Sequence, residues 1–344
     1  MKKVMKNIYI KIVSLVCIGA FFVMGIFAPY SALAQTKNDN LDYPQPLWKS
    51  EPFSEFNPKD EIVERRTQFG KHFRVSDSSS MAILTAGGSL NYKDGNGKWQ
   101  TIDTRIIKNN SGRNSQYEYV SAENRFTSFY SAHVNNGTLT KIDDYEFTDG
   151  LNKQMVWLDE NYNVVASVNI KSQKQIIIEQ NTITYKEILP GIDLRYTQGS
   201  DGRHMDYIIA NSKFLDDMPK NAKYLAFVED INLSENWSAR YSGAHKEKME
   251  KEEMQQVFVF NEKDKMLLNY KEPFYYEMNN EQEGDAGIYR FTQAGKNLNI
   301  STVVPTDWLA DNSRSFPVVI DPTYTIATTN DTYSTQYHLE KIHI

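Results

Sequence analysis

The stretch from residue 183 to residue 210 constrains the fold of this chain more than any other. Its apolar residues alternate, or nearly alternate, with polar residues, which is the period of strands that bury one face. Pro190-Gly191 interrupts the first run, and a glycine-rich turn at 199–202 separates the next two. The sequence therefore predicts three consecutive strands, with these apolar positions: Ile183, Tyr185, Ile188, Ile192, Leu194, Tyr196, Met205, Tyr207 and Ile209.

Short apolar runs separated by turn residues recur along most of the chain. The 344 residues include 21 Tyr and 17 Phe, which favour strands. The clearest hairpin spans 89–103, where Asp94-Gly95-Asn96-Gly97 supplies the positive φ angles of a tight turn. This pattern predicts an all-β fold, a β-sandwich built as one large sandwich or two adjacent ones. The exception is 244–256, where charged helix formers predict a short helical or charged insert.

Residues 1–34 have the form of a signal peptide. A start with four lysines precedes an apolar run over 12–28, and Ala32-Leu33-Ala34 fits the small-x-small cleavage signature. Cleavage after Ala34 would leave Gln35 as the first residue. An uncleaved membrane anchor is the alternative, because the apolar run approaches the length that crosses a bilayer. Cys17 is the single cysteine, so the mature chain would hold neither a disulfide nor a thiol.

We divide the remaining chain into three segments. Residues 35–60 contain four prolines and form an extended arm, either pinned to the surface by its aromatic residues or left as a loose linker. Residues 61–323 form the β-sandwich region, and its last strand ends before Pro322. Residues 324–344 form a C-terminal tail, the start of a missing module. We expect 327–344 to be loosely attached, with an edge strand as the alternative.

The charge balance limits the partners of the chain. The leader holds four lysines and no acidic residue, so its removal changes the formal net charge from −6 to −10. An acidic protein is a poor partner for nucleic acid or for anionic membrane surfaces. Asp94, Asn96 and Asp103 raise the question of calcium, but the loop lacks the later oxygen ligands and the closing Glu of an EF-hand. The sequence predicts no metal and no cofactor.

Four carboxylates on or beside predicted strands are the candidates for chemistry, since paired carboxylates cleave glycosidic bonds. They are Glu187, Asp193, Asp206 and Asp230. The alternation turns Asp193 away from the apolar face, and we expect structural roles for all four. The histidines lack metal-binding spacing, and a G-x-S-x-G motif is absent from the sequence. We therefore assign no catalytic residue.

Four of the five tryptophans lie in the predicted β-sandwich region and could stack on sugars: Trp99, Trp157, Trp237 and Trp308. We expect them to be core residues instead, and we expect the same of Tyr196, because Trp99 and Tyr196 are in phase with apolar neighbours beside strong turns.

Several strings of the sequence resemble the N-terminal β-rich region of large secreted bacterial surface proteins, including wall-associated, Rhs-type and DNRLRE-containing proteins. The matching pieces lie between about residues 61 and 333 and include Glu64-Arg65-Arg66, Leu90 to Asp94, Gly97-Lys98-Trp99, Tyr185, Leu189 to Tyr196, Trp308-Leu309 and Phe316 to Thr323. In such proteins this region resembles a non-catalytic module that precedes repeat arrays or effector domains. The resemblance implies a secreted or cell-surface location and a structural or adhesive role.

We therefore predict a secreted or cell-surface, non-catalytic β-sandwich module of a larger exported protein. Its partners would be a cell-surface glycan or protein and the downstream modules of the same chain. The alternative is a carbohydrate-active protein, either a glycan-binding module or a glycosidase. An open, acid-lined groove with exposed aromatic rings would favour the alternative.

Overall fold

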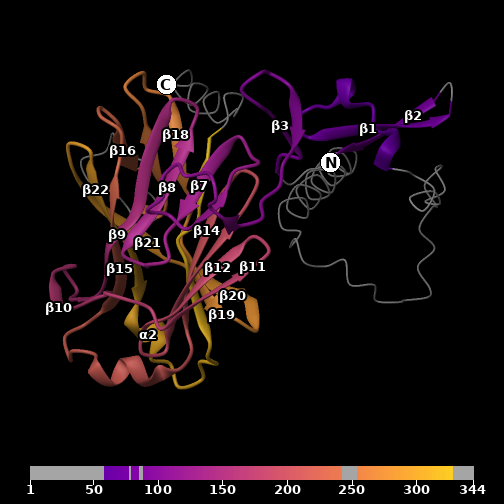
Figure 1. Cartoon of the computed structure of the whole chain (residues 1–344). Helices are drawn as coiled ribbons and strands as arrows, with labels where there is room; N and C mark the ends of the chain where they lie inside the picture. The colour runs from indigo at the N-terminus through magenta and orange to yellow at the C-terminus, as the bar shows by residue number, and fades with distance from the viewer. Residues whose placement is uncertain (1–57, 77–78, 85–87, 242–253, 328–344) are drawn as a thin grey trace, which may run out of the picture. The chain divides into compact units, whose positions relative to one another are not determined.

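The computed structural model describes residues 58–76, 79–84, 88–241 and 254–327, and their fold is all-β, as predicted (Figure 1). Two large antiparallel sheets form a β-sandwich. The predicted leader and most of the arm and the tail lie outside the described residues. So does most of the predicted insert at 244–256, of which only residues 254–256 are described. Within the described part, no helix is long and apolar enough to cross a membrane.

The first large sheet contains nine of the described strands. In chain order they are β5 (Ile107–Lys108), β6 (Tyr119–Ser121), β7 (Phe126–Tyr130), β8 (Asn136–Ile142), β9 (Tyr145–Leu158), β10 (Val164–Asn169), β15 (Tyr224–Asn232), β21 (Ile288–Ala294) and β22 (Asn297–Pro305). Their spatial order is β21-β22-β15-β9-β8-β7-β6-β5, and β10 pairs with the second half of β9. We call this the nine-stranded sheet.

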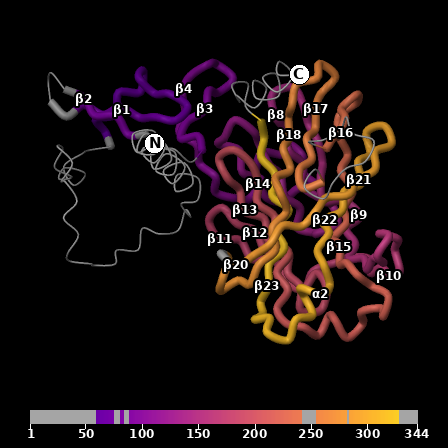
Figure 2. Tube along the Cα trace, turned by 180° about the vertical axis from the view of Figure 1, so that it is seen from behind, coloured from indigo at the N-terminus to yellow at the C-terminus, as the bar shows by residue number. Residues whose placement is uncertain are grey.

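The second large sheet contains eleven of the described strands. They are β11 (Gln175–Glu179), β12 (Thr182–Leu189), β13 (Ile192–Gln198), β14 (Gly202–Ile209), β16 (Ser238–Tyr241), β17 (Val257–Phe260), β18 (Met266–Tyr270), β19 (Phe274–Glu277), β20 (Asn280–Ala286), β23 (Val318–Asp321) and β24 (Tyr324–Ile326). The main order is β11-β12-β13-β14-β24-β18-β17-β16, and β23 joins β14 to β19 and β20 (Figure 2). The three strands predicted over 183–210 are β12, β13 and β14.

Smaller elements precede and decorate the sandwich. Strands β1 (Gly70–Ser76) and β2 (Ser79–Leu84) pair with each other, as do β3 (Asn91–Lys93) and β4 (Trp99–Thr101). The β3–β4 hairpin confirms the position of the predicted turn, although within it only Gly97 has a positive φ, of 75°. Asp94 Oδ1 accepts hydrogen bonds from the backbone of Asn96 and Lys98. The helical turns are η1 (Pro58–Asp60), η2 (Val63–Arg65), η3 (Ser212–Asp217) and α2 (Thr306–Leu309).

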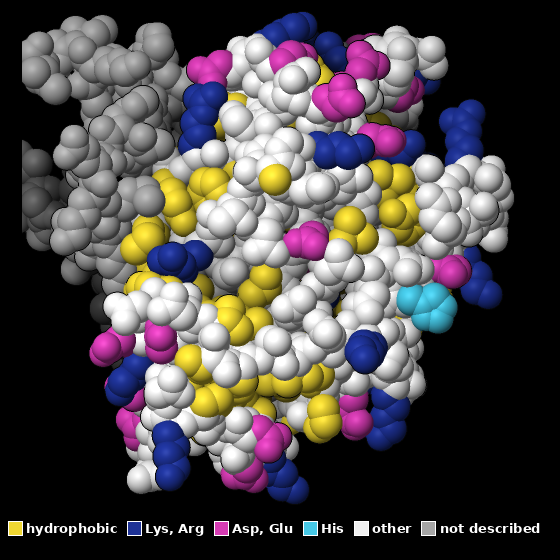
Figure 3. All heavy atoms as spheres, turned by 90° about the vertical axis from the view of Figure 1, so that its left-hand side faces the viewer, with side chains coloured by type: hydrophobic (Ala, Val, Ile, Leu, Met, Phe, Trp, Pro, Cys, Tyr) yellow, Lys and Arg dark blue, Asp and Glu magenta, His cyan; other side chains and the backbone are white. Residues whose placement is uncertain are grey.

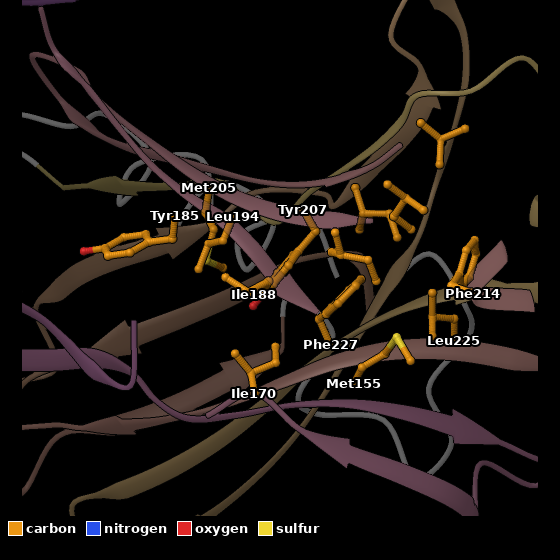
Figure 4. Packing of buried hydrophobic residues seen from close by; sticks show 14 of the residues in the cluster. Met155, Ile170, Tyr185, Ile188, Leu194, Met205, Tyr207, Phe214, Leu225 and Phe227 are labelled. Carbon is orange, nitrogen blue, oxygen red and sulfur yellow. The ribbon is translucent and has the colours of Figure 1, made fainter. Parts of the chain in front are cut away.

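The core lies between the two large sheets and draws on both of them. The apolar positions predicted over 183–210 all face it, and none is more than 5% exposed. Figure 4 shows Tyr207 of β14 pointing across the gap toward Phe227 of β15. Their rings stack with centroids 3.8 Å apart and planes 7° apart. Stacked aromatic pairs of this kind add to the stabilisation from burial itself.

Two boundaries differ from the predictions. The apolar runs at 145–147 and 155–158, separated by polar residues, predict two short strands. The structure instead has the single strand β9 over both runs, because the residues between them also pair with β15. The sandwich also extends three residues past the boundary expected at 323. Tyr324 and Ile326 of β24 are buried, and β24 pairs with both β14 and β18. β24 lies between β14 and β18, and these two strands are the pairing partners that the sequence did not reveal.

The predicted core tryptophans divide into two groups. Trp157 and Trp237 are buried, as predicted, and so is Tyr196. The prediction for Trp99 was wrong, because its ring lies half-buried on the small β3–β4 sheet with Lys93 Nζ 5.1 Å from the ring centroid. Trp308 is half-buried as well, and the Arg314 guanidinium covers its ring at 3.7 Å.

Candidate functional site

The four carboxylates predicted as candidates for chemistry are each engaged by neighbours. Glu187 forms an ion pair with Lys174, Asp193 with Lys186 and Asp206 with Arg195, and Asp230 accepts hydrogen bonds from Asn152 and Asn299. Asp193 faces away from the core, as the alternation predicted, and also accepts a hydrogen bond from the backbone N–H of Glu187. The structure does not bring these four carboxylates together at one site.

A carboxylate that the sequence reading missed stands opposite Asp206. Strand β14 pairs with β23 through Tyr207 and Ile320, and with β24 through Arg203 and Tyr324, in one continuous register. That register places Asp206 directly across from Asp321 on the outer face of the eleven-stranded sheet. Directly opposed like charges destabilise a sheet. A pair of like charges opposed in this way is a reason to look for a function at that position.

Two contacts offset the repulsion within the Asp206–Asp321 pair. Arg195 donates to Asp206 Oδ2 from Nε at 2.9 Å and from Nη2 at 2.7 Å. The Thr323 hydroxyl donates to Asp321 Oδ1 and lies 3.1 Å from Nδ1 of His204. Burial, and next the negative charge of Asp206, raise the pKa of Asp321 to about 7 against that hydrogen bond.

With this arrangement, the Asp321 carboxyl group can take up and release a proton near neutral pH. A carboxyl group with a pKa of about 7 is poised to act as a general acid or base. The sequence predicts Asp321 only as the end of the last strand, and it assigns no role to His204. Their proximity follows from pairing between distant segments, which spacing along the chain does not encode. Among the described residues, no group of three His, Cys, Asp or Glu side chains could hold a metal ion.

A second group of charges lies inside the sandwich, and the sequence reading missed it as well. Asp149, Lys153, Arg203 and Glu229 are each at most 3% exposed. Arg203 of β14 donates through Nη2 to Asp149 Oδ2 of β9, so this ion pair joins the two large sheets. The pair is surrounded by aromatic rings, with the Arg203 guanidinium carbon 5.1 Å from the centroid of Tyr196. We call these four residues the buried charge cluster.

The buried charge cluster is held by backbone carbonyls as well as by charge. Lys153 Nζ donates to the carbonyls of Gly150 and Val134. Gly150 has a φ of 71°, which favours glycine, and a Cβ there would lie 2.2 Å from Lys153 Nζ and displace the ammonium group. Burial lowers the pKa of Lys153 to about 8, and burial raises the pKa of Glu229 to about 7. Because these groups are sealed between the sheets, their role is in packing.

Asp206 and Asp321 are therefore the candidate site for proton chemistry, and the buried charge cluster is a structural feature. No protein-family model, curated protein or solved structure matches this chain.

Proposed function

We propose that this chain is a non-catalytic β-sandwich module of a larger exported protein, with a structural or adhesive role. The basic start, apolar run and Ala32-Leu33-Ala34 of the leader support export. The resemblance of the 189–196 and 316–323 strings to secreted bacterial surface proteins supports the modular role. The partners we propose are a surface glycan or protein and further modules of the same protein.

The ion pair between Arg203 and Asp149 is the observation that carries this proposal. The sequence has no cysteine after Cys17, so disulfides cannot cross-link the mature chain. A guanidinium and a carboxylate instead connect the two large sheets across their interface, each 1% exposed. Removing one partner of such a pair leaves an uncompensated buried charge, so the folded sandwich depends on both partners being present. A sandwich fastened in this way suits a module that bears load outside the cell.

A carbohydrate-active enzyme is the second candidate, and the Asp206–Asp321 pair is the observation that favours it. Glycosidases use two carboxyl groups, one of them with a raised pKa. Here, however, two N–H groups of Arg195 donate to the carboxylate of Asp206, and Asp206 is only 6% exposed. A carboxylate so enclosed is poorly placed to reach a sugar, and this favours the non-catalytic role.

A hydrolysis screen separates the two candidates. Residues 35–344 would be incubated with a panel of soluble polysaccharides, and reducing ends would be measured for the wild type, Asp206→Asn and Asp321→Asn. We expect no turnover by any of the three proteins. Turnover by the wild type that is abolished in either variant would establish the enzyme and refute the non-catalytic proposal.

The export part of the proposal has its own test. Intact-mass measurement of the protein recovered from the medium or the cell surface should give a chain that begins at Gln35. A protein that retains the leader, or that stays inside the cell, would contradict signal-peptide cleavage. Changing Ala34 to a bulky residue, Ala34→Trp, should block processing, because the cleavage site requires small residues.

A further inference from the structure

The outer face of the nine-stranded sheet carries a pocket of about 340 Å³, on the side of that sheet away from the sandwich core. Its floor includes Ile288 of β21 and Val303 of β22, which belong to a small apolar cluster separate from the main core. Small-molecule sites are concave and lined mostly by apolar groups, with volumes of about 300–1,000 Å³. The pocket lies at the lower end of that range, which suits one or two rings.

One wall of the pocket is a pair of tyrosines. Tyr162, in the turn between β9 and β10, stacks on Tyr224 of β15 with ring centroids 4.6 Å apart and planes 16° apart. The Arg290 guanidinium carbon lies 4.5 Å from the Tyr162 centroid and also holds that ring in place. Burial raises the pKa of Tyr162 to about 12, so its hydroxyl keeps its proton at neutral pH. The wall is therefore pre-organised, which reduces the entropy lost on binding.

The rim of the pocket carries hydrogen-bonding groups of both charges. Glu160 and Asp307 supply carboxylates, and Lys223 supplies an ammonium group. All three residues are exposed. The lining therefore combines two negative side chains with one positive side chain, and this mixture disfavours a strongly anionic ligand. Figure 3 shows one side of the molecule, on which hydrophobic side chains likewise lie among charges of both signs.

We propose that this pocket binds a neutral sugar ring of a glycan, an assignment that rests on the adhesive role proposed above. A pyranose has an apolar face, which fits the Ile288–Val303 floor and the tyrosine wall. Its hydroxyl groups donate to carboxylates and accept from an ammonium group, which matches Glu160, Asp307 and Lys223. A purely apolar ligand would leave the rim groups unpaired, and this costs affinity.

The test is calorimetric titration of residues 35–344 with neutral trisaccharides, namely chitotriose, cellotriose, maltotriose and mannotriose, and with trigalacturonic acid as the anionic comparison. We expect at least one neutral trisaccharide to bind and trigalacturonic acid to bind more weakly. Asp307→Asn and Glu160→Gln should each weaken binding about tenfold or more, since hydrogen bonds to charged groups are among the stronger ones. Asp144→Asn, a change of an exposed carboxylate at the β8–β9 turn, is the matched control and should bind like the wild type.

Three outcomes would overturn the assignment. Absence of binding across the neutral panel, equal or tighter binding of trigalacturonic acid, or binding unchanged in both pocket variants would each do so. The exposure of Glu160 and Asp307 makes misfolding a poor explanation, and thermal melting of each variant checks this point. Hydrolysis of a bound sugar would refute the non-catalytic role and leave the pocket assignment standing. Conversely, a non-catalytic exported protein without sugar affinity would refute the pocket alone.

Discussion

Asp149 and Arg203 form an ion pair between the two large sheets, and each residue is 1% exposed. Asp149→Ala should lower the free energy of unfolding by about 3–5 kcal/mol, because Arg203 would stay buried without its carboxylate. Chemical denaturation measures this loss. Glu146→Ala is the control, since it removes an exposed pair with Lys141 at 3.1 Å and should cost less than about 1 kcal/mol. Equal losses in the two variants would contradict the role given to the buried pair.

Asp321 makes the stability of the fold depend on pH. Its folded-state pKa, about 7, lies above the value of about 3.9 in an unfolded chain, so the native state binds the proton more tightly. The stabilisation is complete below about pH 4 and is lost as the pH rises through about 7. The asparagine side chain of Asp321→Asn cannot ionise. As the pH rises from about 5 to about 8, the free energy of unfolding of Asp321→Asn should therefore fall less than that of the wild type.

Denaturation midpoints of the wild type and Asp321→Asn across that range check the expectation. Glu229 also has a raised pKa of about 7. Its ionisation should therefore make the stability of both proteins fall with rising pH, even where Asp321 is absent. Parallel pH profiles for the two proteins would show that Asp321 does not titrate differently on folding. Asp144→Asn should leave the wild-type profile unchanged.

At the scale of elements, strand β24 tests how far the sandwich extends. Ile326 is 2% exposed, between β14 and β18. Ile326→Ala should cost about 2–5 kcal/mol, as for other large-to-small changes in a core. Val164→Ala on β10, at a position 62% exposed, should be close to neutral. Denaturation curves for both variants decide the matter, and a negligible effect at Ile326 would mean that the sandwich ends at β23.

The elements that follow local rules were predictable, and those that depend on distant partners were not. Turn chemistry revealed the β3–β4 hairpin, and alternation revealed β12, β13 and β14. Strand β9 was read as two strands because Asp149 and Lys153 look like surface residues, whereas their partners bury them. The Asp206–Asp321 pair was hidden for a related reason, since only the register of β14 against β23 and β24 brings the two residues together.

At the scale of the whole molecule, two outer faces carry separate features. The Asp206–Asp321 pair lies on the outer face of the eleven-stranded sheet, and the pocket of Tyr162 and Tyr224 lies on that of the nine-stranded sheet. Neither sits in the core, where the buried charge cluster holds the sheets together. Changes at the pocket should therefore leave the pH profile of stability unaltered, because distant sites act additively. Measuring that profile for Asp307→Asn checks this, and a changed profile would show coupling between the faces.

The position of β24 also determines how the fold resists a pulling force. The chain leaves the described sandwich at residue 327 from a strand paired on both sides, and the Ala327 carbonyl accepts a hydrogen bond from Arg125 Nη1 at 3.1 Å. Tension applied beyond this point must break the ladders to β14 and β18 together before β24 can be extracted. In single-molecule stretching from the C-terminal side, Arg125→Ala should lower the rupture force of the first event. A module attached there would transmit its load directly into the middle of the eleven-stranded sheet.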